Sequence, residues 1–257
     1  MQLISRLELV FMHPLLRQTG HRPIPMPHGP WIMVQNWCDL LFAHWEVSAE
    51  QLRRLVPSQL ELDLLNSKAY AAVTPFHISG LRPRYLPALP VISRFPELNV
   101  RTYVRYKGIP GVFFFSLDAG NLSAVWGARI GYGLPYLHAK MPTKASADKF
   151  DYSSQRLQHP RPAEFIGRYW PTSAARQREK DSLEFFLTER YCLYTVRKGQ
   201  VFRAHIHHVP WPLQDADAEI QVNTMAKAAG IDLPNTQPLL HFSRFLQVLV
   251  WWPERAD

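Results

Sequence analysis

The chain has 257 residues, of which 47% are hydrophobic and 19% are charged. This composition is typical of a packed globular protein and excludes an intrinsically disordered chain. A net charge of +8 would permit binding to nucleic acid. The basic residues are scattered, however, and no Lys/Arg block, zinc-finger or helix-turn-helix pattern accompanies them. We therefore do not expect nucleic acid to be the main partner.

The cysteines and apolar runs bear on location. Cys38 and Cys192 lie far apart without a CxxC spacing, which excludes a disulfide framework and a cysteine zinc site. The apolar run at 7–16 contains Glu8 and Pro14, so it does not resemble a signal peptide. The run at 245–252 is too short to span a bilayer, which needs about 20 residues. We expect a cytoplasmic protein with reduced thiols, no cofactor and no membrane association.

The first elements follow a proline-rich stretch. Residues 1–30, with prolines at 23, 25, 27 and 30, predict an extended N-terminal arm. Residues 31–47 predict one or two buried strands. Ser48 predicts the N-cap of a helix over 48–57, which Pro57 ends. Residues 61–76 predict two strands joined by a turn at Asn66 and Ser67.

The clearest alternation lies at 99–108, where one face carries Val100, Thr102 and Val104 and the other Arg101 and Tyr103. A second buried strand follows the turn at 107–111, and a short helix at 121–130 is left open. Residues 142–160 predict a polar loop, and 181–211 a capped short helix followed by a hairpin that turns at 198–199. Residues 217–230 predict an amphipathic helix, and 241–252 a closing strand.

No repeat and no linker divides the chain after residue 31. Short strands with few helices favour a closed β structure, because closure removes exposed strand edges. We therefore expect residues 31–257 to form a single, mainly β domain.

Several long motifs resemble one known family. They are FAHWEV, FPELNVRTYVRYKG, VFFFSLDA, AVWGARIGYGLPY, FLTERYCLYT, IHHVPWPL and LLHFSRFLQVLVW. Together, over about residues 21–253, they resemble the uncharacterised bacterial YqjF-like family of the acetoacetate decarboxylase-like superfamily. The resemblance implies a conical, mainly antiparallel β-barrel with a few short α-helices and an internal small-molecule cavity. It also implies that the chain could form a homo-oligomer.

Acetoacetate decarboxylases carry Gly-Arg-Glu, four residues, then Pro-Lys-Lys, and the first lysine of the pair forms a Schiff base. The second lysine lowers the pKa of the first, which makes its amine nucleophilic. In the stretch ARIGYGLPYLHAKM, Arg129 and Pro135 match the motif. Ile130 replaces its glutamate, and Tyr136 and Leu137 replace both lysines. The resemblance therefore implies a protein that is not a Schiff-base decarboxylase.

Lys140 is a poor substitute for the missing lysine, because four residues of strand place it about 13 Å from Tyr136. The residues that we expect to bind a ligand are Arg101, Tyr103, Arg129, Tyr136 and His138. An arginine in a cavity would clamp a carboxylate. The alternative is that Arg101 and Tyr103 lie on an outward, solvated face.

If the protein is an enzyme, the candidates for proton transfer are Tyr136, His138 and Glu189. Glu189 could instead fix a corner between a helix and a strand. The alternation in HIHH places His205 and His207 on one face, where two imidazoles could bind a metal. A third ligand would have to come from His44, His77, His138 or Glu189. We expect no metal, because nothing in the spacing demands one and hydrogen bonds to neighbouring strands explain such a pair better.

Three hypotheses follow, in this order. The first is a protein that binds a small carbonyl or carboxylate metabolite in an internal cavity. The second is a lyase or hydrolase that acts on keto-acid-like substrates with tyrosine, histidine or glutamate as acid and base. The third is a basic interaction protein that associates with nucleic acid.

Overall fold

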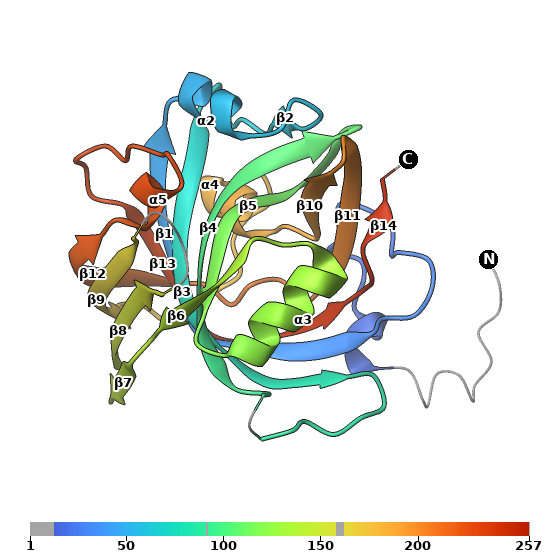
Figure 1. Ribbon diagram of the computed structural model, residues 1–257, viewed down its shortest axis with the longest axis horizontal. Coiled ribbons are helices and arrows are strands. Elements are labelled where there is room, and N and C mark those ends of the chain that lie inside the picture. The colour runs from blue at the N-terminus through green and yellow to red at the C-terminus, as the bar shows by residue number, and fades with distance from the viewer. Residues whose placement is uncertain (1–12, 91, 158–161, 257) are drawn as a thin grey trace.

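The computed structural model describes residues 13–90, 92–157 and 162–256. Strands make up most of it (Figure 1). They are β1 (Met33–Val47), β2 (Glu61–Leu62), β3 (Ala69–Pro83), β4 (Phe95–Tyr106), β5 (Ile109–Ala119), β6 (Tyr136–Lys140), β7 (Thr143–Ser146), β8 (Lys149–Arg156), β9 (Glu164–Pro171), β10 (Cys192–Arg197), β11 (Gln200–His207), β12 (Gln214–Asn223), β13 (Leu239–Val250) and β14 (Glu254–Arg255). The helices are the 3₁₀ turn η1 (Pro14–Arg17), α2 (Ala49–Leu55), α3 (Leu122–Tyr132), α4 (Leu183–Thr188) and α5 (Met225–Ala228).

A closed ring of strands forms the centre of the molecule. Going round it, β1 pairs with β3, β3 with β4, β4 with β5, β5 with β10, β10 with β11, β11 with β13, and β13 with β1. Each of these pairs is antiparallel except β5 with β10. The closed β structure expected from the sequence is therefore present as a barrel.

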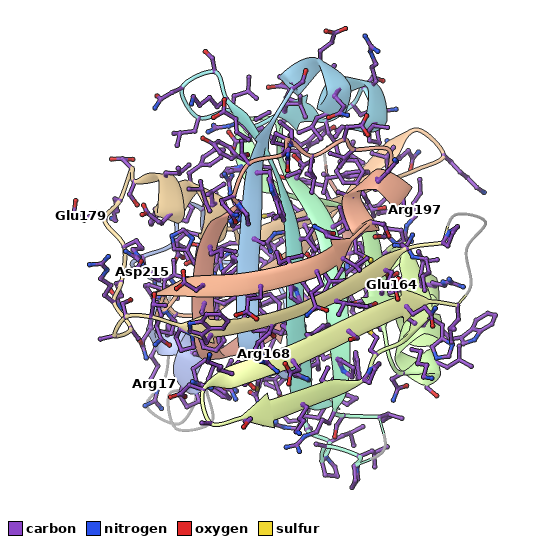
Figure 2. The ribbon with its side chains drawn as sticks, turned by 90° about the vertical axis from the view of Figure 1, so that its left-hand side faces the viewer. Arg17, Glu164, Arg168, Glu179, Arg197 and Asp215 are labelled. Carbon is purple, nitrogen blue, oxygen red and sulfur yellow. The ribbon has the colours of Figure 1, made fainter. Side chains whose placement is uncertain are left out.

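A second layer of strands covers one side of the barrel. Strands β6, β8, β9 and β12 connect β5 to β13, and β7 pairs with β8. Figure 2 shows this layer crossing the strands behind it, with Arg168 on the outer surface of β9. Aromatic side chains such as Phe165, Tyr169 and Phe242 fill the space between the layers. Both faces of β1, β3 and β4 are therefore buried, one towards the barrel interior and one towards this second layer.

Most elements agree with the sequence. Ser48 Oγ accepts a hydrogen bond from the Gln51 amide over 3.4 Å and caps α2. Asn66 and Ser67 form the expected turn with φ angles of 50° and 65°. The hairpin at 198–199 and the closing strand β13 are likewise confirmed. The stretch left open at 121–130 is the helix α3.

Two predictions were wrong. The polar stretch at 142–160 is not a loop over its described residues, which end at 157, because β7 and β8 form a hairpin there, with Phe150 and Tyr152 buried on alternate positions. The stretch at 217–230 is mostly strand β12, and only residues 225–228 are helical. In both cases β9, which the sequence did not reveal, provides the pairing partner. Tertiary pairing thus overrides local helix and loop propensity.

The described part of the N-terminal arm packs on the barrel. Leu15 is buried against Val34, Leu249 and Trp251. Arg22 Nη1 donates to the carbonyl of Ile206 over 2.8 Å. Residues 1–12 of the expected arm lie outside the described residues. Within the described ranges, no helix is long and apolar enough to cross a membrane.

Candidate functional site

A cavity of about 430 Å³ lies inside the barrel, and residues of α3 form part of its wall. Figure 1 shows α3 lying across one end of the barrel. Most of its wall is apolar, with side chains from β1, β3, β4, β5 and α3. The described polar residues in the wall are Gln35, Glu97, Asn99, Arg101, Ser123, Tyr132 and Tyr136. A concave, mainly apolar site with a few convergent polar groups is the usual form of a small-molecule site.

Tyr136 and Glu97 form a hydrogen-bonded pair in the cavity wall. The Tyr136 hydroxyl donates to Glu97 Oε2 over 2.9 Å. Burial raises the pKa of Glu97 to about 8; the Tyr136 hydrogen bond opposes this, and the charge of Asp118 adds to it. Burial, with the adjacent Glu97, also raises the pKa of Tyr136 well above its ordinary value. Near pH 7 the pair is therefore mostly neutral and can both donate and accept protons.

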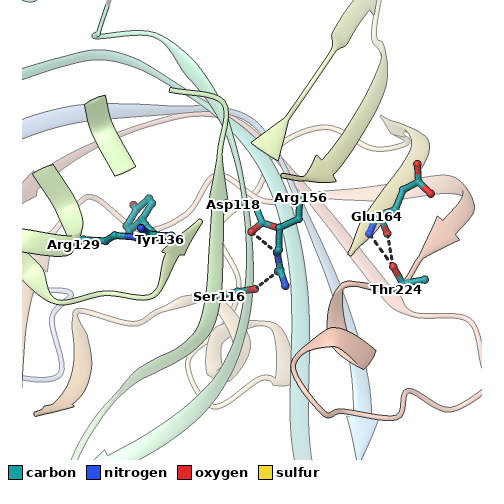
Figure 3. Close-up of polar contacts among 7 residues, drawn as sticks. All are labelled: Ser116, Asp118, Arg129, Tyr136, Arg156, Glu164 and Thr224. Atoms are coloured by element: carbon teal, nitrogen blue, oxygen red, sulfur yellow. Dashed lines mark hydrogen bonds and ion pairs between the residues drawn. The ribbon is translucent and has the colours of Figure 1, made fainter. Parts of the chain in front are cut away.

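Arg129 binds the backbone of Tyr136 and does not face the cavity. Its Nε donates to the carbonyl of Tyr136 over 2.5 Å. Figure 3 draws the two residues next to each other. Arg129 is not among the cavity-lining residues. Because Arg129 lies in the last turn of α3 and Tyr136 begins β6, this bond fixes the helix against the strand that carries the tyrosine.

Arg101 and Asn99 lie farther along β4, with side chains that face the interior. Arg101 is 8% exposed, and its guanidinium carbon lies 5.1 Å from the centre of the Phe42 ring. Neither Arg101 Nε nor Asn99 Oδ1 has a hydrogen-bond partner among the described residues. Both atoms are buried polar groups in residues of the cavity wall, and a buried polar group without a partner is costly.

Tyr103 continues the same face of β4 but does not line the cavity. Its hydroxyl lies 2.6 Å from Nε2 of His44 and donates to the carbonyl of Leu187 over 2.8 Å. These bonds tie β4 to β1 and to the end of α4, beyond Arg101. Tyr103 therefore closes the barrel interior behind the arginine.

His138 and Glu189 lie away from the cavity wall. The backbone carbonyl of His138 accepts from the Leu157 amide over 2.9 Å, which joins β6 to the end of β8. Glu189 accepts hydrogen bonds from the Trp211 amide and the Tyr191 hydroxyl, and burial raises its pKa. These contacts are those of a residue that fixes the corner between α4 and β10.

The histidines at 205–208 bond to neighbouring segments. His207 Nε2 lies 2.9 Å from the carbonyl of Leu15, and His205 Nε2 lies 3.2 Å from Glu254 Oε1. Burial lowers the pKa of both imidazoles to about 4. In the part of the chain that the structure describes, no group of three or more His, Cys, Asp or Glu side chains is arranged to hold a metal.

Every lysine of the chain is exposed to solvent. They are Lys68, Lys107, Lys140, Lys144, Lys149, Lys180, Lys198 and Lys227, and all lie within the described ranges. None belongs to the residues that line the cavity. Lys140 is exposed at the end of β6 and does not line the cavity, so no lysine amine faces a ligand bound there.

The sequence did not reveal two features, one in the cavity wall and one that contributes to the fold. Glu97 and Asn99 precede Arg101 at alternate positions of β4, so extending the alternation two residues back from 99 would have included Glu97. The second feature is a buried ion pair, shown in Figure 3, in which Arg156 Nε donates to Asp118 Oδ1 over 2.9 Å and Nη2 to Ser116 over 3.0 Å. It was missed because Arg156 fell in the predicted loop.

Comparison with solved structures identifies the fold. Over 96% of both chains, the structure matches acetoacetate decarboxylase from Legionella pneumophila with a TM-score of 0.61 and 13% identity. It matches the enduracididine biosynthesis enzyme MppR complexed with pyruvate over 93% of this chain and 97% of that one, with a TM-score of 0.60 and 10% identity. The expected conical, acetoacetate decarboxylase-like β-barrel with a few short helices is therefore confirmed.

Sequence comparison identifies the family. The uncharacterized protein YqjF of Bacillus subtilis (strain 168) is 51% identical over 228 residues, which cover 89% of this chain and 94% of that relative. The model of the DUF2071 family, described as an uncharacterized conserved protein, matches residues 34–247. The resemblance that the motifs indicated is thus confirmed, and the chain belongs to the DUF2071 family.

Proposed function

We propose that the protein binds a small carbonyl or carboxylate metabolite in the barrel cavity. The observation that carries this proposal is the state of Arg101. Three of the described arginines are buried, and two of them, Arg156 and Arg190, pair with Asp118 and Asp63. Arg101 makes no ion pair with any described carboxylate. A buried cation without an anion is strongly disfavoured, so a ligand carboxylate is the natural partner.

The Tyr136–Glu97 pair supports a carbonyl or second polar group on the same ligand. Both side chains line the cavity. Because the Tyr136 hydroxyl gives its one proton to Glu97, a protonated Glu97 is the donor left for the ligand, and the Tyr136 oxygen can accept a hydrogen bond. Among the structural relatives, MppR holds pyruvate, a keto acid. With no lysine in the cavity wall, the ligand would be held by hydrogen bonds and charge and would form no Schiff base.

Ligand-induced stabilisation tests this proposal. A panel of carboxylates and keto acids is added to the protein, and thermal unfolding is followed by fluorescence. Binding at one hundred times Kd raises the unfolding free energy by about 2.7 kcal/mol. We expect Arg101→Gln to remove the response and Arg54→Gln, a change of an exposed arginine on α2, to preserve it. If every responding acid stabilised Arg101→Gln as strongly as the parent protein, the proposal would be wrong.

A second candidate function is catalysis of proton transfer, as a lyase or hydrolase with keto-acid-like substrates. The observation that favours it is Glu97, a carboxyl with a pKa of about 8 inside the cavity. Because His138 and Glu189 lie outside the wall, the acid and base in this candidate are Tyr136 and Glu97. We expect turnover of a β-keto acid to fall at least a hundredfold in Glu97→Gln and Tyr136→Phe. Equal rates in both variants and the parent would remove it.

Location and assembly are part of the same proposal. Cys38 and Cys192 are both free, as a reducing cytoplasm would keep them. A homo-oligomer is proposed from the superfamily resemblance, and light scattering coupled to size-exclusion chromatography measures it directly.

A further inference from the structure

We infer that the ligand is a monocarboxylic acid with a long apolar body, bound with its carboxylate on Arg101 at the inner end and its tail towards the mouth. This inference rests on the proposed function and narrows the ligand class.

Strand β4 gives the cavity a direction. Phe95, Glu97, Asn99 and Arg101 all line it and follow one another at alternate positions. Six residues of strand span about 20 Å, so the cavity runs for roughly that distance along β4. Phe95 lies opposite Ile78 of β3, near the end that α3 covers, whereas Arg101 lies opposite Ala72, deep in the barrel. The guanidinium group is therefore at the far end of the cavity from its mouth.

The mouth of the cavity is the end where lining residues are exposed to solvent, and it is apolar. Trp252 and Ile92 belong to the cavity wall and are 59% and 36% exposed. The Trp252 ring stacks on Tyr132 of α3 at 5.9 Å between ring centres. Among the described residues that line the cavity, Glu97 and Arg101 alone are charged. The rim thus offers apolar contact and no ionic partner, which fits the tail of a ligand rather than its head.

The size of the cavity separates a long acid from a short one. A volume of 430 Å³ lies in the range of roughly 300–1,000 Å³ that holds drug-sized ligands. If one methylene occupies about the space of one water molecule, near 30 Å³, about a dozen such groups fill it. An acid of three or four carbons bound at Arg101 would leave most of the apolar wall wet. A chain that reaches Trp252 buries that wall.

A chain-length series tests the inference. Straight-chain acids from acetate to dodecanoate, together with pyruvate and acetoacetate, are titrated against the whole protein, with 1-decanol as the uncharged control. Binding is read from the fluorescence of Trp37 and Trp252, which both line the cavity, and by calorimetry. We expect the affinity to rise roughly fourfold per methylene until the cavity is full.

Variants at the two ends test the orientation. We expect Arg101→Gln to weaken decanoate at least tenfold and to leave decanol unchanged. Trp252→Ala is expected to weaken dodecanoate more than butanoate, because only the longer tail reaches the mouth. Arg54→Gln is the matched control, and circular dichroism checks that each variant is folded.

The possible outcomes separate this inference from the proposed function. If pyruvate or acetate bound as tightly as decanoate, the long apolar body would be wrong while the proposed function held. If acids of every length failed to bind the folded protein, the proposed function itself would be wrong. If decanol matched decanoate and Arg101→Gln altered neither, the carboxylate head at Arg101 would be overturned.

Discussion

The Tyr136 hydroxyl donates to Glu97 Oε2 over 2.9 Å, although the two residues lie 39 positions apart in the chain. Strand β5 separates their strands, since β4 pairs with β5 and β5 pairs with β6. The tyrosine occupies the position that the resemblance assigns to the Schiff-base lysine. On that alignment, a hydrogen-bonded tyrosine and glutamate stand where the resemblance places an amine.

The pair makes stability depend on pH. The pKa of Glu97 is about 8 in the folded protein and near 4.5 when unfolded. Between these values the unfolded chain has lost the proton that the folded chain keeps, so stability falls as pH rises through 4.5–8. Glu97→Gln mimics the protonated acid and removes this loss. We expect the free energy of unfolding of the variant, relative to the parent, to be about 2–4 kcal/mol greater at pH 9 than at pH 5.

Urea unfolding at both pH values measures the difference. Glu219→Gln, a change of an exposed glutamate on β12, is the matched control and should shift stability equally at both. If Glu97→Gln behaved as this control does, Glu97 would be ionised in the folded protein near neutral pH.

The absence of a lysine from the cavity wall gives a second prediction. Borohydride trapping with acetoacetate or pyruvate should yield no specific adduct on the parent protein, because every lysine is exposed. Tyr136→Lys places an amine in the cavity beside Glu97 and should be trapped by acetoacetate at position 136. Peptide mass spectrometry locates the adduct. A single stoichiometric adduct on Lys140 of the parent would contradict this prediction.

Sequence patterns predict where the strands of the barrel lie. They do not predict which face of a strand points into the barrel. The alternation around Arg101 predicts β4, yet both of its faces are buried, so polarity could not tell the interior from solvent. Only the ring of strands turns Arg101 inward, and only the second layer covers Val100 and Leu98 on the opposite face.

The two residues of the hydrogen-bonded pair differ in how well the sequence predicts them. Tyr136 was predicted as a site residue because the resemblance aligned it with a lysine, and it does line the cavity. Glu97 has no local signature, since its raised pKa and its partner both arise from pairing across β5. The second layer was missed for a similar reason, because β8 and β12 gain their strand conformation from β9.

The buried ion pair between Arg156 and Asp118 gives a third prediction, which concerns the free energy of unfolding. Arg156 and Asp118 are almost fully buried, and Arg156 also bonds to Ser116. Arg156→Met leaves the Asp118 carboxylate buried without this cation, which is expected to cost about 3–5 kcal/mol of unfolding free energy. Urea unfolding at pH 7 measures it. Arg54→Gln, which removes an exposed pair with Glu50, should change stability by less than about 1 kcal/mol. A loss of similar size in both variants would mean that the buried pair contributes little.

A fourth prediction concerns acid unfolding, where His208 acts in the opposite direction to Glu97. Its ring is buried, stacks on Tyr191 at 4.6 Å between ring centres and lies 2.7 Å from the carbonyl of Val209. Burial lowers its pKa from 6.5 to about 4, so the unfolded chain binds more protons over that range. The contribution of His208 to stability is therefore fully present above pH 6.5 and is lost as the pH falls towards 4.

His208→Gln should make the unfolding free energy depend less on pH between pH 6.5 and pH 4, the range called the acid limb here. We expect the parent to lose about 2–3 kcal/mol more than the variant between pH 6.5 and pH 4. Because Glu97 affects the same range above pH 4.5, both proteins are compared in a Glu97→Gln background. His28→Gln, a change of an exposed histidine, should leave the limb intact. If the two histidine variants followed the same curve, His208 would bind its proton equally in the folded and unfolded chains, and its burial would not account for the acid sensitivity.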